Sequence, residues 1–335
     1  MPGDSGVRRQ THRYAMESDE GGQARDHFYA PQYYLAGFAR NRSEGSQLYV
    51  VDSTATQAFF TALRNVAVDP DVSRLVAGLE DPKLFGSSNA EFESKLGHAL
   101  VRTDAKGDFQ HDGDRAIILG LVAMLAVCNS GRRELTRHMK AQETRRQLEL
   151  AVANRQRWES QKRKAAEAGV DGAADLTYEK VRELVERGDF TSAVPTTEYV
   201  GQDLKSLNTV YNLLHRRSWV VGRAAPGSGG FATSDRPVTL CWDDKEMEGG
   251  FYPPSFGLLG TSVFCPLSKS LAIRGRFDGR ADAIELPAKA VAGINSRTIF
   301  YADRQIYAEN DRFRFLDQHL VMRYGHDLLA MLLAP

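Results

Sequence analysis

The sequence predicts an α+β fold that is mostly helical, with a small mixed or antiparallel sheet assembled from N-terminal and C-terminal segments. Residues 46–53 and 56–60 are short apolar and aromatic runs around a turn, which is typical of paired strands. Residues from about 71 to 217 have helical character. After Trp219 the chain becomes β-rich again, in short runs separated by Gly, Pro and Ser. Strands on both sides of a helical middle predict a sheet that draws on distant segments.

We expect the chain to consist of a leader and a single folded domain. Residues 1–24 form a polar leader that we expect to be disordered. Residues 25–335 are expected to form a single α+β domain, because a chain of this length with 42% apolar residues can bury a sizeable core. The domain would begin with a short helix after Pro31, whose missing N–H suits a first turn. Three apolar side chains would share one face of this helix: Tyr34, Leu35 and Phe38.

The helical middle section contains four segments with helix signals. A Ser/Asn cap signal begins a helix at residues 88–101, and Asp114 would cap an apolar helix at 115–128. A long polar helix is expected from about 132 to 168, ending at a Gly-containing loop. A further helix at 196–217 carries apolar residues at helical spacing.

The C-terminal part returns to strands and then to helices. The strand candidates are residues 218–224, 229–234, 237–242, 261–268 and 270–276. Two helices are expected to follow, from about 285 to 308 and from about 312 to 333.

Composition favours a cytoplasmic protein without membrane contact. Lys+Arg and Asp+Glu are each 43, so no overall charge indicates nucleic acid or an anionic membrane as a partner. The three cysteines form no CxxC pair, which argues against a disulfide framework and suits a reducing compartment. The most apolar run, residues 116–127, is shorter than the roughly 20 residues that cross a bilayer. The N-terminus lacks the apolar stretch of a secretory signal.

Seven stretches carry a family resemblance: HFYAPQYYLAGFA (27–39), LYVVD (48–52), RNVAV (64–68), SWVV (218–221), FATSDRPV (231–238), CPLS (265–268) and INSRTIFYADRQIYA (294–308). In this order they resemble the bacterial family catalogued as domain of unknown function 4238, from about residue 26 to residue 309. The resemblance pairs an H-x-x-x-P-x-x-Y-L-x-x-F opening with a later T-S-D-x-P. The family usually has Asn where this chain has Arg236, so no role is carried over to that side chain. The resemblance implies a fold family and supplies no activity.

The T-S-D sequence has two interpretations. It lies after a β run and before Pro237, where Ser and Asp side chains accept bonds from nearby backbone N–H groups and stabilise a turn. Alternatively, both side chains face a cleft at a strand end. Asp235 would then be a base or metal ligand, and Ser234 a donor to a phosphate or substrate. The chain has no G-x-S-x-G motif, so a nucleophile elbow is not supported.

Two further polar residues lie inside the matched segments. His27 precedes the first helix, whose positive dipole end favours neutral imidazole, the form needed for a general base or metal ligand. The alternative is a histidine that bonds a carbonyl and packs against an aromatic ring. Asn295 falls on the apolar stripe of the late helix, so its amide would be buried and need partners. It would either tie a loop to the helix or orient a catalytic group.

Two charged segments require separate interpretation. Residues 107–114, GDFQHDGD, cluster carboxylates with His111, which is compatible with metal binding, although a loop and helix cap are the favoured interpretation. Between Gly131 and Ala168 eleven basic residues stand against five acidic ones. This stripe would either contact phosphates or be a solvated surface. Its candidate phosphate-binding residues are Arg145, Arg146, Arg155 and Arg157.

Two hypotheses of function follow. In the first, which we favour, the protein is a hydrolase-type enzyme with phosphodiesters as candidate substrates. Four residues would meet in one cleft: His27 as base or ligand, Asp235 as its orienting partner or a metal ligand, Asn295 as a positioning group, and Ser234. A divalent metal is compatible with this site, and no nucleotide-cofactor motif is present. In the second, the protein is a non-catalytic binding module whose basic helix, residues 132–164, contacts nucleic acid or an acidic partner. The expected ligands are thus nucleic acid or a phosphorylated small molecule.

Overall fold

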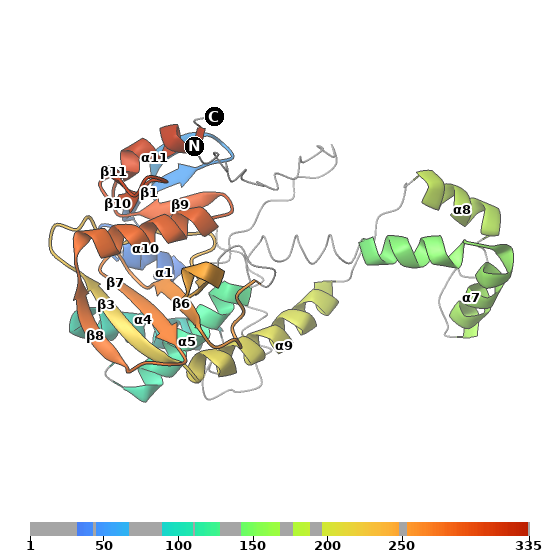
Figure 1. The fold of residues 1–335 in the computed structure, drawn as a ribbon, viewed down its shortest axis with the longest axis horizontal. Coiled ribbons are helices and arrows are strands. Elements are labelled where there is room, and N and C mark those ends of the chain that lie inside the picture. The colour runs from blue at the N-terminus through green and yellow to red at the C-terminus, as the bar shows by residue number, and fades with distance from the viewer. Residues whose placement is uncertain are drawn as a thin grey trace, which may run out of the picture.

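Two β-sheets and the helices packed around them make up most of the described chain, which confirms the predicted α+β class (Figure 1). The structure is a computed structural model, and His27 and the leader lie outside the residues that it describes. Those residues are 32–42, 45–66, 89–109, 111–127, 142–167, 177–187, 196–247 and 253–333.

The first sheet joins the two ends of the chain, as predicted. Its strand order is β2-β1-β9-β4, and neighbouring strands are antiparallel. The strands are β1 (Gln47–Asp52), β2 (Gln57–Ala62), β4 (Thr233–Ser234) and β9 (Gln305–Ala308). The register places Asp52 opposite Gln305 and Ser234 opposite Ile306. Two polar residues far apart in the sequence therefore flank β9.

The second sheet uses only residues between Ser218 and Leu286. Its order is β5-β6-β7-β3-β8, with β3 and β8 parallel and the other pairs antiparallel. Its strands are β3 (Ser218–Ala224), β5 (Thr239–Trp242), β6 (Thr261–Pro266), β7 (Leu271–Arg276) and β8 (Asp282–Leu286). Strands β3, β5, β6 and β7 fall within predicted strand segments.

A large hydrophobic core lies between the second sheet and helices from the first two thirds of the chain. The elements are α1 (Gln32–Leu35), the 3-10 turns η1 (Ala36–Phe38), η2 (Leu63–Asn65) and η4 (Lys245–Met247), and helices α4 (Asn89–Lys106), α5 (Asp112–Val127) and α9 (Thr196–His215). Phe38, Phe92 and Ile118 contribute fully buried side chains to this core, and Val221 and Ile273 face them from the sheet. Burial of these apolar surfaces is the main force that holds the helices on the sheet.

Helix α5 begins at Asp112, before the position predicted from a cap at Asp114. Asp114 lies in the first turn of the helix and is buried. Its carboxylate accepts bonds from Nε and Nη2 of Arg102 at 2.9 and 2.5 Å. The carboxylate that the sequence pattern assigned to helix capping is therefore paired with Arg102 on α4.

The two predicted C-terminal helices are both too long. The segment 285–308 contains the end of β8, then α10 (Ala288–Tyr301), then β9. The apolar periodicity of this segment continues to Ile306, but residues 305–308 pair with β1 instead of extending the helix. The segment 312–333 forms the hairpin β10 (Arg314–Leu316) and β11 (Met322–Tyr324) before α11 (Gly325–Leu333). Pairing between strands overrides the local helical pattern in both places.

The basic helical segment has a small hydrophobic cluster of its own. Residues 142–151 are helical, residues 152–154 interrupt the helix, and α7 (Arg155–Glu167) follows, so the predicted continuous helix 132–168 is broken there. Helix α8 (Tyr178–Arg187) packs against α7 through Trp158. Figure 1 draws α7 and α8 apart from the sheets.

Candidate active site

Asp235 lies directly after β4, where its carboxylate binds the backbone that leads into β9. Its Oδ1 accepts the N–H of Asp303 at 2.9 Å, and its Oδ2 accepts the N–H groups of Arg304 and Gln305 at 2.7 and 2.8 Å. Its own backbone N–H donates to the carbonyl of Gln305 at 3.0 Å. The carboxylate thus holds the backbone between α10 and β9, where the helix has ended.

Asp52 approaches the same dipeptide from the end of β1. Its carboxylate is bound by side chains: Nε of Arg304 donates to Oδ2 at 2.9 Å, and Nε2 of Gln305 donates to Oδ2 at 2.6 Å. The N–H groups of Thr54 and Ala55 donate to Oδ1 at 3.1 and 2.8 Å. The Asp52 residue is 2% exposed. Two carboxylates from distant segments therefore bracket Arg304 and Gln305, one through the backbone and one through the side chains.

The two carboxylates have opposite shifts in pKa. Burial raises the pKa of Asp235 to about 6, assisted by the charge of Asp303 and opposed by the backbone bonds. Burial by itself would raise the pKa of Asp52, but the bonds from Ala55, Gln305 and Arg304 outweigh it and hold that pKa below its usual value. Near neutral pH, Asp52 is therefore a fixed anion, whereas Asp235 is able to exchange a proton. Such a separation is the pattern by which two carboxyl groups take different roles in acid–base chemistry.

Tyr307 adds a protonated hydroxyl to this cluster. Its hydroxyl donates to Oε1 of Gln305 at 2.6 Å. Burial raises the pKa of Tyr307 well above its ordinary value, and the charges of Asp235 and Asp52 raise it further. The phenol therefore stays neutral and fixes the amide of Gln305, which in turn donates to Asp52.

Tyr34 joins three of the segments that carry the family resemblance. Its hydroxyl donates to the carbonyl of Pro266 at 2.8 Å and lies 2.8 Å from Oγ1 of Thr233. The side chain is fully buried, and burial raises the pKa of the phenol well above its usual value. The neutral phenol makes two hydrogen bonds and thereby connects α1 with the T-S-D turn and with the C-P-L-S segment at the end of β6. Matched segments that are distant in sequence thus meet in one place.

Ser234 and Asn295 are held by main-chain contacts. Oγ of Ser234 accepts the N–H of Arg236 at 3.1 Å, as in the turn interpretation. The fully buried amide of Asn295 accepts the N–H of Ala232 at 2.9 Å and donates to the carbonyls of Gly230 and Arg314 at 2.9 and 2.8 Å. Asn295 therefore ties helix α10 to the segment before β4 and to β10, which is the loop-tying alternative.

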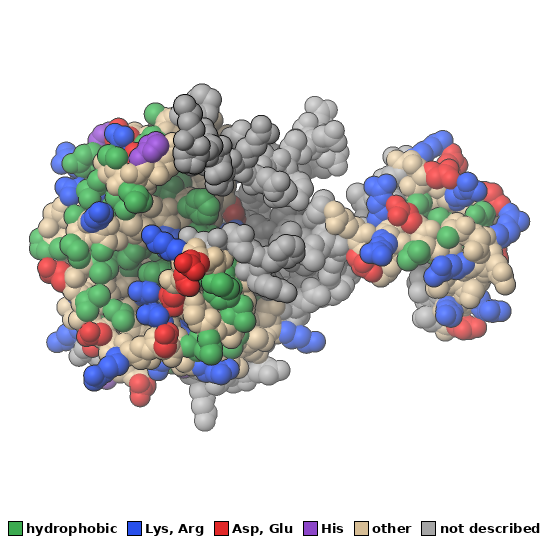
Figure 2. All heavy atoms as spheres, viewed as in Figure 1, with side chains coloured by type: hydrophobic (Ala, Val, Ile, Leu, Met, Phe, Trp, Pro, Cys, Tyr) green, Lys and Arg blue, Asp and Glu red, His purple; other side chains and the backbone are tan. Residues whose placement is uncertain are grey.

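The remaining predicted site residues are of two kinds. His27 lies outside the described residues. The four arginines of the basic segment are exposed: Arg145, Arg146, Arg155 and Arg157. Arg145 pairs with Glu149 at 3.0 Å, and Arg155 pairs with Glu179. Figure 2 shows basic and acidic side chains mixed over the separate helical part on the right. Within the described part of the chain, no three His, Cys, Asp or Glu residues are placed to hold a metal ion.

Sequence reasoning missed Asp52, Arg304 and Gln305. A signal was present, because Asp52 ends the matched stretch LYVVD and the other two lie in ADRQIYA. Asp52 ends a buried strand, and Arg304 and Gln305 lie at the start of another. Charged and polar residues are seldom found at such positions when they serve apolar packing alone. What the pattern could not supply was the register that places them opposite each other.

Comparison with known proteins identifies one family. The family described as Protein of unknown function (DUF4238) matches residues 26–312 of the 335, which includes every segment of the site described above. No curated protein and no solved structure matches the chain. None of the described helices is long and apolar enough to cross a membrane. Because the match covers most of its length, the chain belongs to the DUF4238 family.

Proposed function

We propose that the protein is a cytoplasmic bacterial hydrolase whose proton-transfer group is Asp235, with phosphodiesters as its substrate class. The observation that carries the proposal is the pair of carboxylates around Arg304 and Gln305 with opposite pKa shifts. Hydrolysis requires a group that accepts a proton from water near neutral pH, and a carboxyl with a pKa of about 6 suits that task. Asp52 would remain ionised and keep Arg304 in place.

Two features support an anionic substrate. The side chain of Arg304 is 39% exposed, although its partner Asp52 is buried. The exposed side chain of Arg236 lies close by and pairs with Asp303 at 3.5 Å. Guanidinium groups bind phosphate oxygens in a planar, two-point geometry. Oδ1 of Asp235 accepts only one of the three backbone bonds, which leaves it the better placed oxygen for a proton.

The location in the cytoplasm is part of the proposal. Cys241 and Cys265 are buried free thiols, which suits a reducing compartment. Burial raises the pKa of Cys265 to about 12, so this thiol is not a nucleophile near neutral pH.

The test is an activity screen of the full chain with matched variants. We expect hydrolysis of bis(p-nitrophenyl) phosphate, assayed with and without Mg²⁺ and Mn²⁺, and an activity that rises with pH with a midpoint near 6. Asp235→Asn should lower kcat by about 100-fold or more, the usual range for a general base. His27→Ala should be tested in parallel, because His27 is the other candidate base.

The matched control is Asp317→Asn. The side chain of Asp317 is 4% exposed and accepts two backbone N–H groups and Nε of Arg323, so it resembles Asp235 in binding the backbone through its carboxylate. We expect its variant to lose stability and keep activity. Absence of hydrolysis of esters, phosphomonoesters and phosphodiesters alike, or equal loss in the two variants, would contradict the proposal.

A second candidate function is nucleic-acid binding by the basic segment. The observation that favours it is that Arg146 and Arg157 are exposed and have no ion pair with a described residue. Charge reversal at both positions should weaken binding of a labelled oligonucleotide and reduce its salt dependence. Unchanged binding after reversal would remove this candidate.

A further inference from the structure

Strand β2 is an exposed edge of the first sheet that carries no charged residue. It is the first strand in the order β2-β1-β9-β4, and no described strand pairs with its outer side. Its sequence is QAFFTA, and residues 57–60 are exposed. Phe59 and Phe60 are 39% and 49% exposed and point to opposite faces of the sheet, because side chains alternate along a strand. An edge of this kind is a template for pairing with another strand.

Two of the other edges in these sheets are short or charged. Strand β4, at the far edge of the first sheet, has only two residues, and both are buried. Strand β8, at one edge of the second sheet, carries the exposed side chains of Asp282 and Glu285. Short strands and charged side chains are the usual protection of a sheet edge. Strand β2 has neither.

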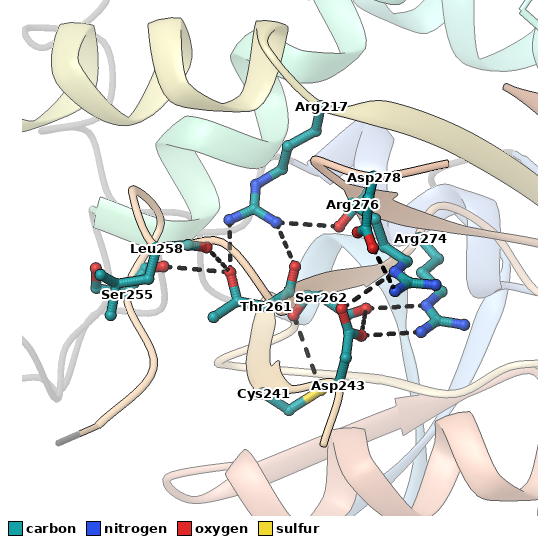
Figure 3. Close-up of polar contacts among 11 residues, drawn as sticks. Arg217, Cys241, Asp243, Ser255, Leu258, Thr261, Ser262, Arg274, Arg276 and Asp278 are labelled. Carbon is teal, nitrogen blue, oxygen red and sulfur yellow. Dashed lines mark hydrogen bonds and ion pairs between the residues drawn. The ribbon is translucent and has the colours of Figure 1, made fainter. Parts of the chain in front are cut away.

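The remaining edge, β5, is occupied by side chains. The N–H of Asp243 donates to the carbonyl of Gly260 at 2.8 Å, so by alternation Leu240 faces away from β6. The hydroxyl of Tyr301 donates to this outward carbonyl at 3.1 Å. Beyond the strand end, the carboxylate of Asp243 pairs with arginines of β7 (Figure 3). Among the described edges of the two sheets, β2 is therefore the one that is long, uncharged and open.

The pairing with β1 determines which backbone groups of β2 face outward. The N–H of Leu63 donates to the carbonyl of Ser46 at 2.8 Å, so these two residues form a hydrogen-bonded pair. Such pairs alternate with non-bonded pairs along antiparallel strands. The register continues this pair through Leu48 opposite Thr61, so the odd-numbered residues of β2 bond to β1. The N–H and C=O groups that face the free edge are those of Ala58, Phe60 and Ala62.

A second copy of β2 matches this edge about a two-fold axis at Phe60. Antiparallel pairing of two identical strands places Phe60 opposite the partner's Phe60, and Ala58 opposite the partner's Ala62. All three outward-facing residues then form hydrogen-bonded pairs, each of which exchanges two bonds. The alanines beside the axis leave room for the two phenylalanine rings. No charge meets its like across the axis, because the strand has none.

The face of the sheet that bears Phe60 adds apolar surface beside the edge. The ring centroids of Phe60 and Tyr49 are 5.2 Å apart. Leu328 of α11 packs in the same buried cluster as Tyr49, and α11 contacts both β1 and β2. The last turn of α11 exposes three apolar side chains: Met331, Leu332 and Leu333. Burial of such surface would add to the hydrogen bonds of a paired edge.

We propose that the protein forms a two-fold symmetric dimer in which β2 pairs with β2 of a second copy. The pairing joins the two four-stranded sheets into one. A second copy brings what the edge presents, namely backbone groups in matching register, a neutral strand and an aromatic ring at the axis. Strand β4, which precedes Asp235, is the opposite edge of the sheet, so the dimer does not depend on the proposed hydrolase activity.

The test is the mass of the full chain in solution, measured by sedimentation equilibrium over a range of concentrations. We expect the natural protein to reach twice the mass of one chain. Phe60→Lys would place two like charges at the axis and should raise the dissociation constant of the dimer at least about 100-fold. Phe300→Lys is the matched control, because Phe300 lies on α10 and is 82% exposed, and it should leave the constant unchanged. A natural chain that stays monomeric, or equal constants for the two variants, would overturn the proposal.

A second variant removes hydrogen bonds without adding charge. Ala62 has a φ of −71°, which proline adopts, and its N–H faces the free edge, so Ala62→Pro should keep the pairing with β1. The dissociation constant should rise at least about tenfold, because each chain loses one donor. Urea unfolding of both variants checks that they are folded. An unchanged constant in folded Ala62→Pro would also overturn the proposal.

Cysteine cross-linking tests the register of the pairing. In Phe60→Cys the two thiols would face each other across the axis, with Cα atoms about 5.5 Å apart, which is within the range of a disulfide. In Phe59→Cys the residue opposite is the partner's Thr61, so the two thiols are offset along the strands. Mild oxidation should therefore link the chains of Phe60→Cys much more than those of Phe59→Cys. Equal yields would refute pairing about Phe60.

Discussion

Replacement of Asp235 by Asn should change how the stability of the protein depends on pH. The carboxyl has a pKa of about 6 in the folded protein, because burial disfavours its charged form, whereas an ordinary aspartate has a value of 3.8. Between these two values the folded state holds more protons than the unfolded state. The free energy of unfolding therefore falls as the pH rises through this window, and it levels off above the folded-state pKa.

The magnitude follows from the difference between the two pKa values. About two units at 1.36 kcal/mol each amount to about 3 kcal/mol of stability in total, of which about 2.5 kcal/mol is lost between pH 4 and pH 7. Asn does not titrate, so the variant lacks this contribution. Asp52 does not interfere, because its folded-state pKa is below the ordinary value and its contribution changes only under more acidic conditions.

The assay is urea unfolding of the natural chain and of Asp235→Asn at half-unit steps from pH 4 to pH 7.5. The difference in unfolding free energy between the two proteins should change by about 2.5 kcal/mol in favour of the variant as the pH rises. Groups that titrate in both proteins cancel in this difference. A difference that stays constant across the range would refute the assigned protonation of Asp235 and, with it, the basis of its proposed role.

Four other substitutions test the fold. Asn295→Ala removes three bonds to backbone groups from a fully buried side chain and should lower stability by about 3–5 kcal/mol in denaturant unfolding. Tyr34→Phe should lower it by about 1–2 kcal/mol, because the carbonyl of Pro266 loses its donor. Gly275→Ala would place a Cβ 2.7 Å from ring atoms of Trp219 and should lower the melting temperature, whereas Gly97→Ala meets nothing within 4 Å and should raise stability by about 0.5–1 kcal/mol.

The sequence predicted those elements whose signal is local. Strands β3, β6 and β7 carry apolar alternation between turn residues, and α9 carries a regular apolar stripe. Strand β9 was assigned to a helix because Ile299, Ala302 and Ile306 also fit helical spacing. The helix ends where the carboxylate of Asp235 binds the N–H groups that follow it, across 68–70 residues of sequence. No window of local sequence contains that contact.

The candidate site was predictable in part for the same reason. Ser234, Asp235 and Asn295 were identified from the polar character of matched segments, and the structure places Ser234 in β4, Asp235 directly after it and Asn295 in α10. Asp52 was not identified, since its partners Arg304 and Gln305 are 252 and 253 residues away. Its role depends on the register between β1 and β9, which only the assembled sheet determines.

A comparison of Asp235 with Asp317 gives the strongest reason to assign a chemical role to the former. Both aspartates accept backbone N–H groups at a chain reversal, and Asp317 is buried whereas Asp235 is half-buried. The N–H of Val321 and the other bonds lower the pKa of Asp317, so its charge stabilises the fold. The pKa of Asp235 is raised instead, so its charge near neutral pH opposes folding. A turn needs only the first arrangement. A carboxyl whose charged form is disfavoured by burial, and that lies within the segment matching the family, supports the proposed role in proton transfer.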